Sequence, residues 1–165
     1  MAKYRMATLF SGAGGLDTAF EESENFDLVF ANDVLSAPAE SYSKNFSHKI
    51  VNAKDFGKGT KLPAYVVGDV TNIDFSPIGK VDCMIGGPPC QDFSITRGGK
   101  RSGINPASNV KKKAEVSRGR LYMGYVRAVK SAEPRFFAFE NVPGLVSAND
   151  GLAYKTIVSD FESHG

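Results

Sequence analysis

The chain has 165 residues, of which 42% are hydrophobic and 23% charged, and its formal net charge is +2. These proportions are typical of one soluble globular domain, and no apolar run approaches the ~18 residues of a transmembrane helix. No apolar signal-peptide core precedes Thr8, so we expect a cytoplasmic location. The few candidate metal ligands, Cys83, Cys90, His48 and His164, show neither a disulfide pattern nor a zinc-site spacing, and we expect no metal.

The first predicted strand, at residues 4–10, runs into a glycine-rich turn and then into a helix at residues 16–23. Leu16, Ala19 and Phe20 give that helix an apolar face at helical spacing. Strand, glycine turn and helix open many nucleotide-binding units, because glycines let the backbone approach a ligand closely. The turn reads Gly-x-Gly-Gly and no Gly-Lys-Ser/Thr follows, which argues against NAD and ATP phosphate sites.

Two acidic residues each follow a predicted strand directly. Asp33 comes after the strand at residues 27–31 and Asp69 after the strand at residues 64–67, while residues 50–62 between them are predicted to be an irregular connection. An acid at the end of the second strand of a Rossmann-like sheet often holds a ribose hydroxyl pair, although Asp is also a common helix N-cap. Together with the glycine turn, the two acids outline a nucleoside-shaped pocket.

The fourth predicted strand, at residues 81–85, ends in two glycines and two prolines, and Cys90 follows them. A thiol just past the carboxyl end of a strand lies where open α/β sheets place their ligands. Taken alone, the pattern fits a small buried thiol as well as a reactive one. The apolar run at residues 136–139 predicts a fifth strand in the centre of the sheet, and Glu140 follows it.

A long segment at residues 95–115 has neither a helical nor a strand period. It overlaps a basic cluster, because residues 97–120 contain eight lysines and arginines and a single acidic residue. Such a segment suits contact with phosphate, although a charge run alone is more often a solvated loop without a partner. Helices are predicted on either side of the fifth strand, at residues 117–131 and 150–161.

Three segments resemble motifs of the cytosine-5 DNA methyltransferases, and the resemblance covers essentially the whole chain. The segments are Phe10-Ser11-Gly12-Ala13-Gly14-Gly15, Gly87-Pro88-Pro89-Cys90-Gln91-Asp92-Phe93-Ser94 and Phe139-Glu140-Asn141-Val142. Weaker matches follow the family's order at Asn32-Asp33, Gly68-Asp69-Val70 and Ser117-Arg118-Gly119-Arg120-Leu121. The resemblance implies an α/β fold, the Rossmann-like fold of S-adenosylmethionine-dependent methyltransferases, with a mostly parallel sheet flanked by helices.

The resemblance also implies a reaction, namely methyl transfer from S-adenosylmethionine to carbon 5 of cytosine in DNA, with S-adenosylhomocysteine as product. The Cys90 thiolate would add to carbon 6, which makes carbon 5 nucleophilic, and Glu140 would hold or protonate ring N3. A base would then remove the carbon-5 proton, and the sulfur would leave. Because the ring cannot be attacked inside a duplex, the target base must be flipped out. The enzyme would be a methylase of the restriction-modification type.

Two further groups of residues are assigned by the same resemblance. The cofactor would be bound by Phe10, Ser11, Gly12, Ala13, Gly14, Gly15, Asp33, Val34, Asp69, Val70, Pro88 and Leu121. Contacts with DNA or with the lid would come from Gln91, Ser94, Arg97, Arg101, Arg118 and Asn141, with residues 93–116 as the mobile basic catalytic loop. Asp33 would bind the ribose hydroxyls, Val34 would pack on the adenine, and Asp69 would accept from the adenine amino group.

Several parts of the family's pattern do not occur in these 165 residues. They are a Gln-x-Arg-x-Arg segment, the target recognition domain, a final helix of the cofactor pocket and two further strands. We therefore expect residues 1–165 to be a partial catalytic domain, either a split subunit or a truncated piece, with strand 136–139 as an open apolar edge. A complementing C-terminal polypeptide or self-association would cover that edge. A tRNA cytosine-5 methyltransferase and a non-catalytic regulatory subunit of the same fold remain as alternatives.

Overall fold

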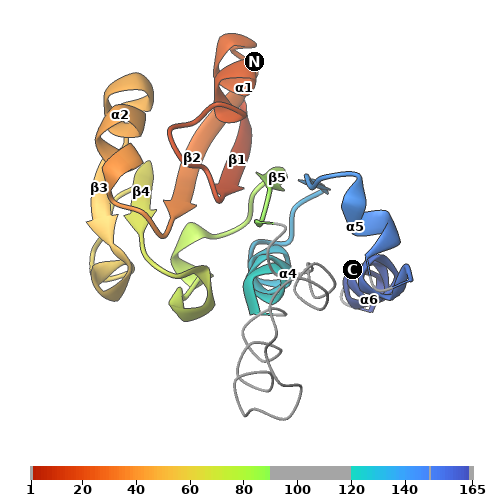
Figure 1. Ribbon diagram of the computed structural model, residues 1–165. Helices are drawn as coiled ribbons and strands as arrows, with labels where there is room; N and C mark the ends of the chain where they lie inside the picture. Colours follow the sequence, from red (N-terminus) through yellow and green to blue (C-terminus); the bar gives the residue numbers. More distant parts are fainter. Residues whose placement is uncertain (1, 90–119, 149, 164–165) are drawn as a thin grey trace.

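The computed structural model describes residues 2–89, 120–148 and 150–163, which form one parallel sheet with helices on both faces (Figure 1). The sheet has six strands in the order β3-β4-β2-β1-β5-β6, and every neighbouring pair is parallel. The strands are β1 Tyr4–Leu9, β2 Phe26–Asp33, β3 Lys49–Asn52, β4 Ala64–Val67, β5 Cys83–Gly86 and β6 Phe136–Phe139. The predicted fold class is confirmed.

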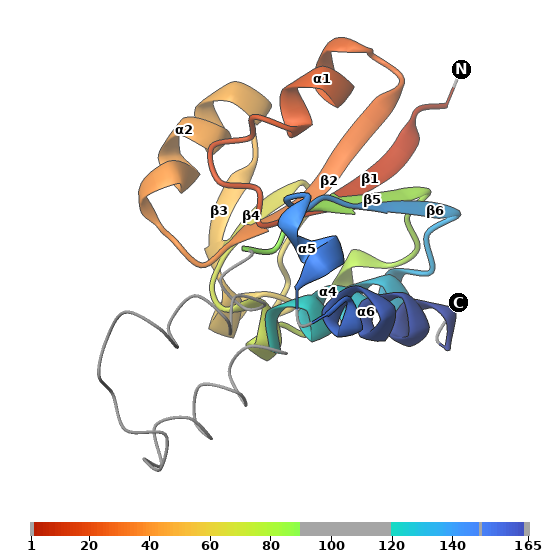
Figure 2. The ribbon, with the colours of Figure 1, turned by 45° about the vertical axis from the view of Figure 1, so that its right-hand side comes forward.

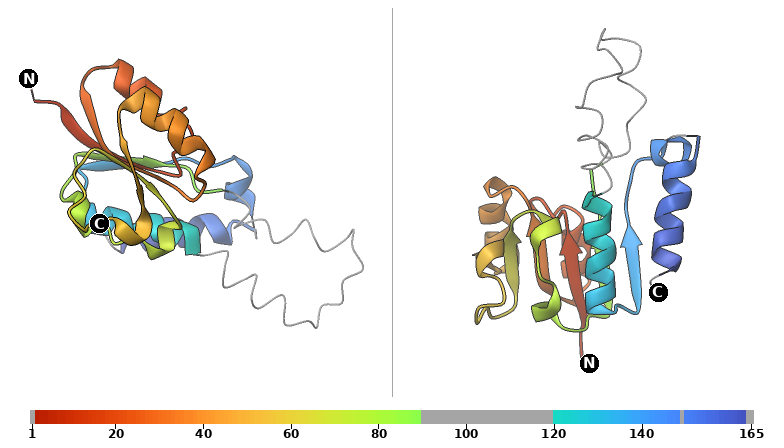
Figure 3. Two further views of the ribbon diagram at one scale, coloured as in Figure 1. Left: turned by 90° about the vertical axis from the view of Figure 1, so that its left-hand side faces the viewer. Right: turned by 90° about the horizontal axis from the view of Figure 1, so that it is seen from below.

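The helices form a layer on each face of the sheet. Figure 2 shows α1 (Asp17–Glu22) and α2 (Ala37–Phe46) on one face, and α4 (Arg120–Ala132) and α6 (Leu152–Glu162) on the other. The remaining short elements are α5 Gly144–Ser147 and three 3₁₀ turns, η1 Ala53–Asp55, η2 Val70–Asn72 and η3 Ser76–Ile78. In the right-hand view of Figure 3, α2 and α6 lie toward opposite ends of the sheet. None of the helices in the described part of the chain has the length and apolar character needed to cross a bilayer.

The two layers explain why the central strands read as apolar runs. A parallel strand between helix layers is buried on both faces, so both sets of alternating side chains must be apolar. In β1, Ala7 and Leu9 face the core that contains α4, whereas Met6 packs on the opposite face with Cys83 and Ile85 of β5. The sheet therefore carries separate apolar clusters above and below it.

The two edge strands compare differently with the sequence-based expectations. The segment predicted as an irregular connection overlaps β3, a short strand with exposed Ile50, which escapes detection because it lacks a buried apolar run. Strand β6 is confirmed at residues 136–139, and it is an edge of the described sheet, as the absence of two further strands predicted and not central as its apolar run indicated. Its aromatic side chains are correspondingly open, with Phe136 51% and Phe137 39% exposed.

Helix α1 differs in the side chains that it buries. The predicted apolar face is wrong, because Leu16 is 48% exposed and Ala19 is also exposed. The buried residue of this helix is Asp17, which is only 1% exposed, while Phe20 is partly buried. A six-residue helix is too short for periodicity to show which side faces the sheet.

Helix α4 contacts the sheet through Tyr125, whose side chain is completely buried. Its hydroxyl donates to the carbonyl oxygens of Met84 in β5 (3.1 Å) and Ala138 in β6 (3.0 Å). Its ring packs edge-on against Phe139 and Phe161, with centroid distances of 5.4 and 5.9 Å. Tyr125 thus links β5, β6, α4 and α6.

Replacing Tyr125 with Phe removes this shared hydroxyl and keeps the ring. We expect the free energy of unfolding, measured by urea denaturation, to fall by about 1 kcal/mol, the net contribution of one buried hydrogen bond. Tyr154→Phe in α6 is the matched control, because Tyr154 is 46% exposed. Equal effects of the two substitutions would contradict the role given to the Tyr125 hydroxyl.

Candidate cofactor and active site

The candidate site lies where the strand order reverses. From β1 the chain adds β2 and β4 on one side and later adds β5 and β6 on the other, so the switch point falls between β1 and β5. Ligands of open α/β sheets bind outside the carboxyl ends of the strands at such a point. The glycine turn follows β1 and the Gly-Gly-Pro-Pro turn follows β5, so the fold brings these two predicted motifs to the same place.

The glycine turn after β1 has a backbone that ordinary side chains disfavour. Phe10 has a positive φ of 58° although it is not a glycine, and Gly14 has a φ of 92°. A Cβ atom on Gly14 would also collide with the Phe46 ring of α2. Left-handed conformations at non-glycine residues are uncommon and often occur at functional sites. The turn is therefore shaped by its packing on α2 as well as by its own sequence.

Polar groups from β2 and β4 hold this turn in place. The Gly12 amide donates to Asp33 Oδ2 (3.0 Å), and the Tyr65 hydroxyl donates to the Gly12 carbonyl oxygen (3.0 Å). The Ser11 amide donates to the carbonyl oxygen of Asn32 (3.0 Å). The turn is thus fixed from β2 and β4 as well as from β1.

Asp33 ends β2 and is partly buried beside the turn. Its Oδ2 accepts from Gly12, and its Oδ1 accepts from the Leu35 amide (2.9 Å). Each carboxylate oxygen can accept a second hydrogen bond, so Asp33 can still receive two hydroxyl donors. The N-cap alternative does not apply, because Ser36 is the N-cap residue of α2. Val34, next to Asp33, is 63% exposed and free to pack on a ring.

Asp69 follows β4 and caps the 3₁₀ turn η2. Its Oδ1 accepts from both the amide (2.9 Å) and the hydroxyl (2.8 Å) of Thr71, so Oδ2 has no partner among the described residues. Val70 is only 2% exposed and packs against Gly124 of α4, where a Cβ atom would overlap it. Any contact of Val70 with a ligand must therefore come from its backbone. Leu121 is partly buried against the same core.

Glu140 follows β6 and lies against the turn that leads to Cys90. Its amide donates to the Gly86 carbonyl oxygen (2.9 Å), and the Asn141 side chain donates to the Pro88 carbonyl oxygen (2.9 Å). A Cβ atom on Gly87 would touch the Glu140 carboxylate. The Glu140 side chain is exposed, so a ligand can reach it.

Several predicted site residues lie outside the described residues, and their positions are not part of this geometry. They are Cys90, Gln91, Ser94, Arg97, Arg101 and Arg118. The other cysteine, Cys83, is fully buried in β5, as expected for a core residue. Burial, assisted by nearby Asp82, raises the pKa of the Cys83 thiol to about 11, which makes it a poor source of thiolate.

Asp17 was not among the predicted site residues, yet it lies beneath the glycine turn. The Thr8 hydroxyl donates to Asp17 Oδ2 (3.0 Å) and lies 2.5 Å from the Ser11 hydroxyl. Burial raises the pKa of the Asp17 carboxyl above its usual range, whereas the hydroxyls of Tyr42 and Thr8 act in the opposite direction. The sequence carries no signal for this placement, because an acidic residue in the first turn of a helix is common at exposed positions.

This chain is similar in sequence to known methyltransferases. The type II methyltransferase M.FnuDI of Fusobacterium nucleatum is 34% identical over 98% of this chain and 39% of its own length. A DNA (cytosine-5-)-methyltransferase of Aeropyrum pernix, M.ApeKI, is 48% identical over 98% of this chain and 33% of its own length. This chain therefore spans only about a third to two fifths of the length of these relatives.

A solved structure shows the same fold, and a family model assigns the family. The Dnmt2 methyltransferase of S. pombe superposes with a TM-score of 0.60 at 18% identity, covering 96% of this chain and 41% of that one, which shows a shared fold. The family model for C-5 cytosine-specific DNA methylase matches residues 4–165. Because that match takes in nearly every residue, including both turns of the candidate site, the chain belongs to the C-5 cytosine-specific DNA methylase family.

Proposed function

We propose that this chain is the cofactor-binding and nucleophile-bearing part of a DNA cytosine-5 methyltransferase of the restriction-modification type. The observation that carries the proposal is the pairing of Glu140 and Asn141 with the turn that leads directly to Cys90. An exposed carboxylate is thereby held beside the turn that precedes Cys90 in the sequence, at the switch point of the sheet. The family membership supports the same activity.

The proposed reaction begins with a cytosine that has been flipped out of the duplex. The Cys90 thiolate adds to carbon 6, and Glu140 stabilises the electron density that moves toward N3. Carbon 5 then takes the methyl group of S-adenosylmethionine, whose sulfur keeps the electron pair and leaves as S-adenosylhomocysteine. Loss of the carbon-5 proton to a base expels the Cys90 thiolate and restores the aromatic ring. The basic segment at residues 93–116 would close over the base and contact phosphate.

The cofactor would lie along the carboxyl ends of β1, β2 and β4. The turn from Phe10 to Gly15 would contact the methionine part, Asp33 the ribose, and Val34 and Asp69 the adenine. The free acceptor positions on Asp33 and on Asp69 Oδ2 support these roles. Pro88 and Leu121 would complete the pocket, and this assignment extends to S-adenosylhomocysteine, which has the same nucleoside.

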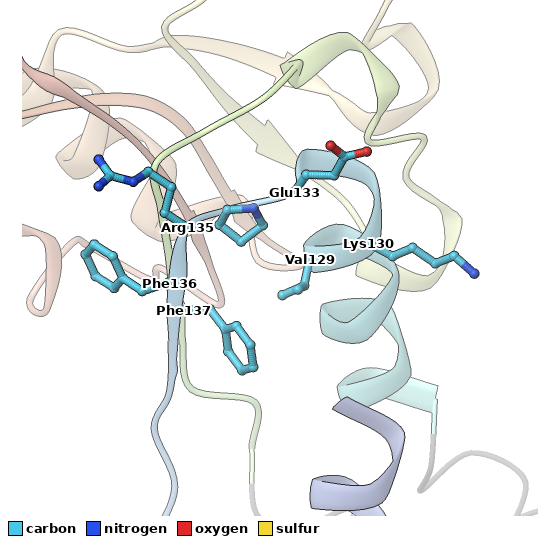
Figure 4. Close-up of a pocket in the computed structure, with 7 residues that line it drawn as sticks. Val129, Lys130, Glu133, Arg135, Phe136 and Phe137 are labelled. Carbon is cyan, nitrogen blue, oxygen red and sulfur yellow. The ribbon is translucent and has the colours of Figure 1, made fainter. Parts of the chain in front are cut away.

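We also propose that a complementing polypeptide covers β6, because the chain spans only part of its relatives and this strand has no outer neighbour in the described sheet. Figure 4 shows Phe136 and Phe137 on opposite sides of the strand. Both residues line a groove of about 590 Å³ next to α4. Unpaired strand edges with apolar side chains favour pairing with further chain. The groove lies at the amino end of β6, away from the proposed active site.

The cofactor assignment predicts that Asp33→Ala weakens binding of S-adenosylmethionine by at least about tenfold, measured by isothermal titration calorimetry. The substitution removes the proposed ribose acceptor and also the partner of the Gly12 amide. Asp27→Ala is the matched control, because Asp27 is exposed near the opposite end of the same strand. Unchanged affinity in Asp33→Ala would contradict the assignment.

The nucleophile assignment predicts that Cys90→Ser abolishes the covalent adduct with DNA that contains 5-fluorocytosine. Fluorine at carbon 5 cannot leave as a proton does, so the enzyme–DNA bond persists and can be seen on a denaturing gel. Cys83→Ala should leave the adduct in place, since Cys83 is buried in the core. An adduct that survives in Cys90→Ser would remove Cys90 from this role.

Because this chain spans only about a third of its relative M.ApeKI, we predict weak methyl transfer by the 165-residue chain alone. Labelled S-adenosylmethionine would be supplied with duplex DNA or with tRNA, in the absence and presence of the part of M.ApeKI that this chain does not cover. We expect that polypeptide to raise transfer to DNA by more than about tenfold, because it would supply the base-holding and base-reading parts. Full turnover by the lone chain would refute this prediction, and transfer to tRNA alone would favour the tRNA alternative.

A further inference from the structure

Asp17 occupies a position that is costly for a carboxylate. It is 1% exposed in the first turn of a short helix, whereas its neighbour Leu16 is 48% exposed. Acidic side chains are almost never fully buried unless they are paired, because the charged form loses its hydration. No ion pair of Asp17 occurs among the described residues, so hydrogen bonds must compensate for its burial.

Those hydrogen bonds lead from Asp17 to the glycine turn. The Thr8 hydroxyl, fully buried in β1, is 3.0 Å from Asp17 Oδ2 and 2.5 Å from the Ser11 hydroxyl. Two tyrosines lie near enough to interact electrostatically with Asp17, Tyr42 from α2 and Tyr65 from β4. The Tyr65 hydroxyl is already used by Gly12, so Thr8 is the link between Asp17 and the turn.

The chemistry of the three groups fixes the direction of this chain of hydrogen bonds. Asp17 Oδ2 is the acceptor in its hydrogen bond with Thr8, so Thr8 gives its single hydroxyl proton to Asp17. The short contact between Thr8 and Ser11 then requires Ser11 to be the donor. The Ser11 proton therefore points into the protein, and the lone pairs of its oxygen are left for a ligand.

We propose that Asp17 is a positioning residue for the cofactor, which acts through Thr8 to make the Ser11 oxygen an acceptor for a cationic amino group. The inference rests on the proposed function, because the methionine part of S-adenosylmethionine carries such an ammonium group. Ser11 is partly buried in the turn that would contact this part of the cofactor. Asp17 itself stays beneath the turn and touches no ligand.

Substitutions at Asp17 should separate hydrogen-bond direction from charge. In Asp17→Ala, Thr8 loses its acceptor and turns its proton toward Ser11, which must then donate outward. We expect the Kd for S-adenosylmethionine to rise about five- to tenfold, the loss expected for one charge-assisted hydrogen bond. Asp17→Asn keeps an acceptor oxygen for Thr8, so its Kd should stay within about twofold of the original.

Two further comparisons test the route through Ser11. In a Ser11→Ala background, Asp17→Ala should cause almost no further loss, because the group on which it acts is missing. Methylthioadenosine lacks the amino acid part of the cofactor, so the original chain and Asp17→Ala should bind it equally. Glu22→Ala serves as a control, since it removes an exposed carboxylate from the same helix.

The experiment is calorimetry of the 165-residue chain and these variants with S-adenosylmethionine and methylthioadenosine, after circular dichroism has shown that each is folded. If Asp17→Ala does not fold, Thr8→Val combined with Asp17→Leu replaces the polar pair with apolar groups and should show the same five- to tenfold loss, about 1 kcal/mol. The inference would be overturned if Asp17→Ala bound S-adenosylmethionine as tightly as the original chain, or if Asp17→Ala and Asp17→Asn lost equal affinity. It would also be overturned if Asp17→Ala lost as much affinity for methylthioadenosine as for S-adenosylmethionine. Each of these outcomes leaves the proposed function standing. No binding of either ligand by the original chain would overturn the proposed function and this inference with it.

Discussion

The parallel pairing of β1 with β2 on one side and β5 on the other is the constraint on which the rest of the structure depends. Parallel strands place all their carboxyl ends at one edge of the sheet, and the reversal of strand order opens a crevice there. The glycine turn, Asp33 at the end of β2, Asp69 after β4 and the turn leading to Cys90 all lie at that edge. The parallel pairing of these strands therefore brings distant parts of the sequence together in one site.

The site is held together more by backbone hydrogen bonds than by ion pairs. Gly12 is fixed by Asp33 and Tyr65, and the strand-end segments after β5 and β6 are joined through Gly86 and Glu140. The three ion pairs among the described residues all involve exposed side chains. Such pairs contribute little to stability, and none of the three involves a residue of the candidate site, which is held by hydrogen bonds. This arrangement leaves acceptor oxygens available for a ligand.

The amount of buried surface differs between the centre of the sheet and its β6 edge. In the central strands β1, β2 and β4, Met6, Phe30 and Tyr65 are fully buried, whereas Phe136 at the β6 edge is half exposed. Tyr125 and Phe161 cover one face of β6, while on the other face Phe136 is half exposed in a pocket shared with Tyr4, Phe26 and Arg135. Since apolar edges are rarely left uncovered in folded proteins, this imbalance agrees with a chain that spans about a third of its relatives.

The sequence by itself determined the family motifs, the α/β class and the order of the strand-end residues, because short turns and buried runs leave local signals. It could not place Asp17 or β3. A six-residue helix has no reliable period, and a half-exposed edge strand has no buried run. The apolar run of β6 indicated a central strand by itself, and only the absence of the family's two further strands predicted its place at the edge. Tertiary structure decided these features, since the sheet alone determines which side of α1 is buried and which hydroxyls reach its carboxylate.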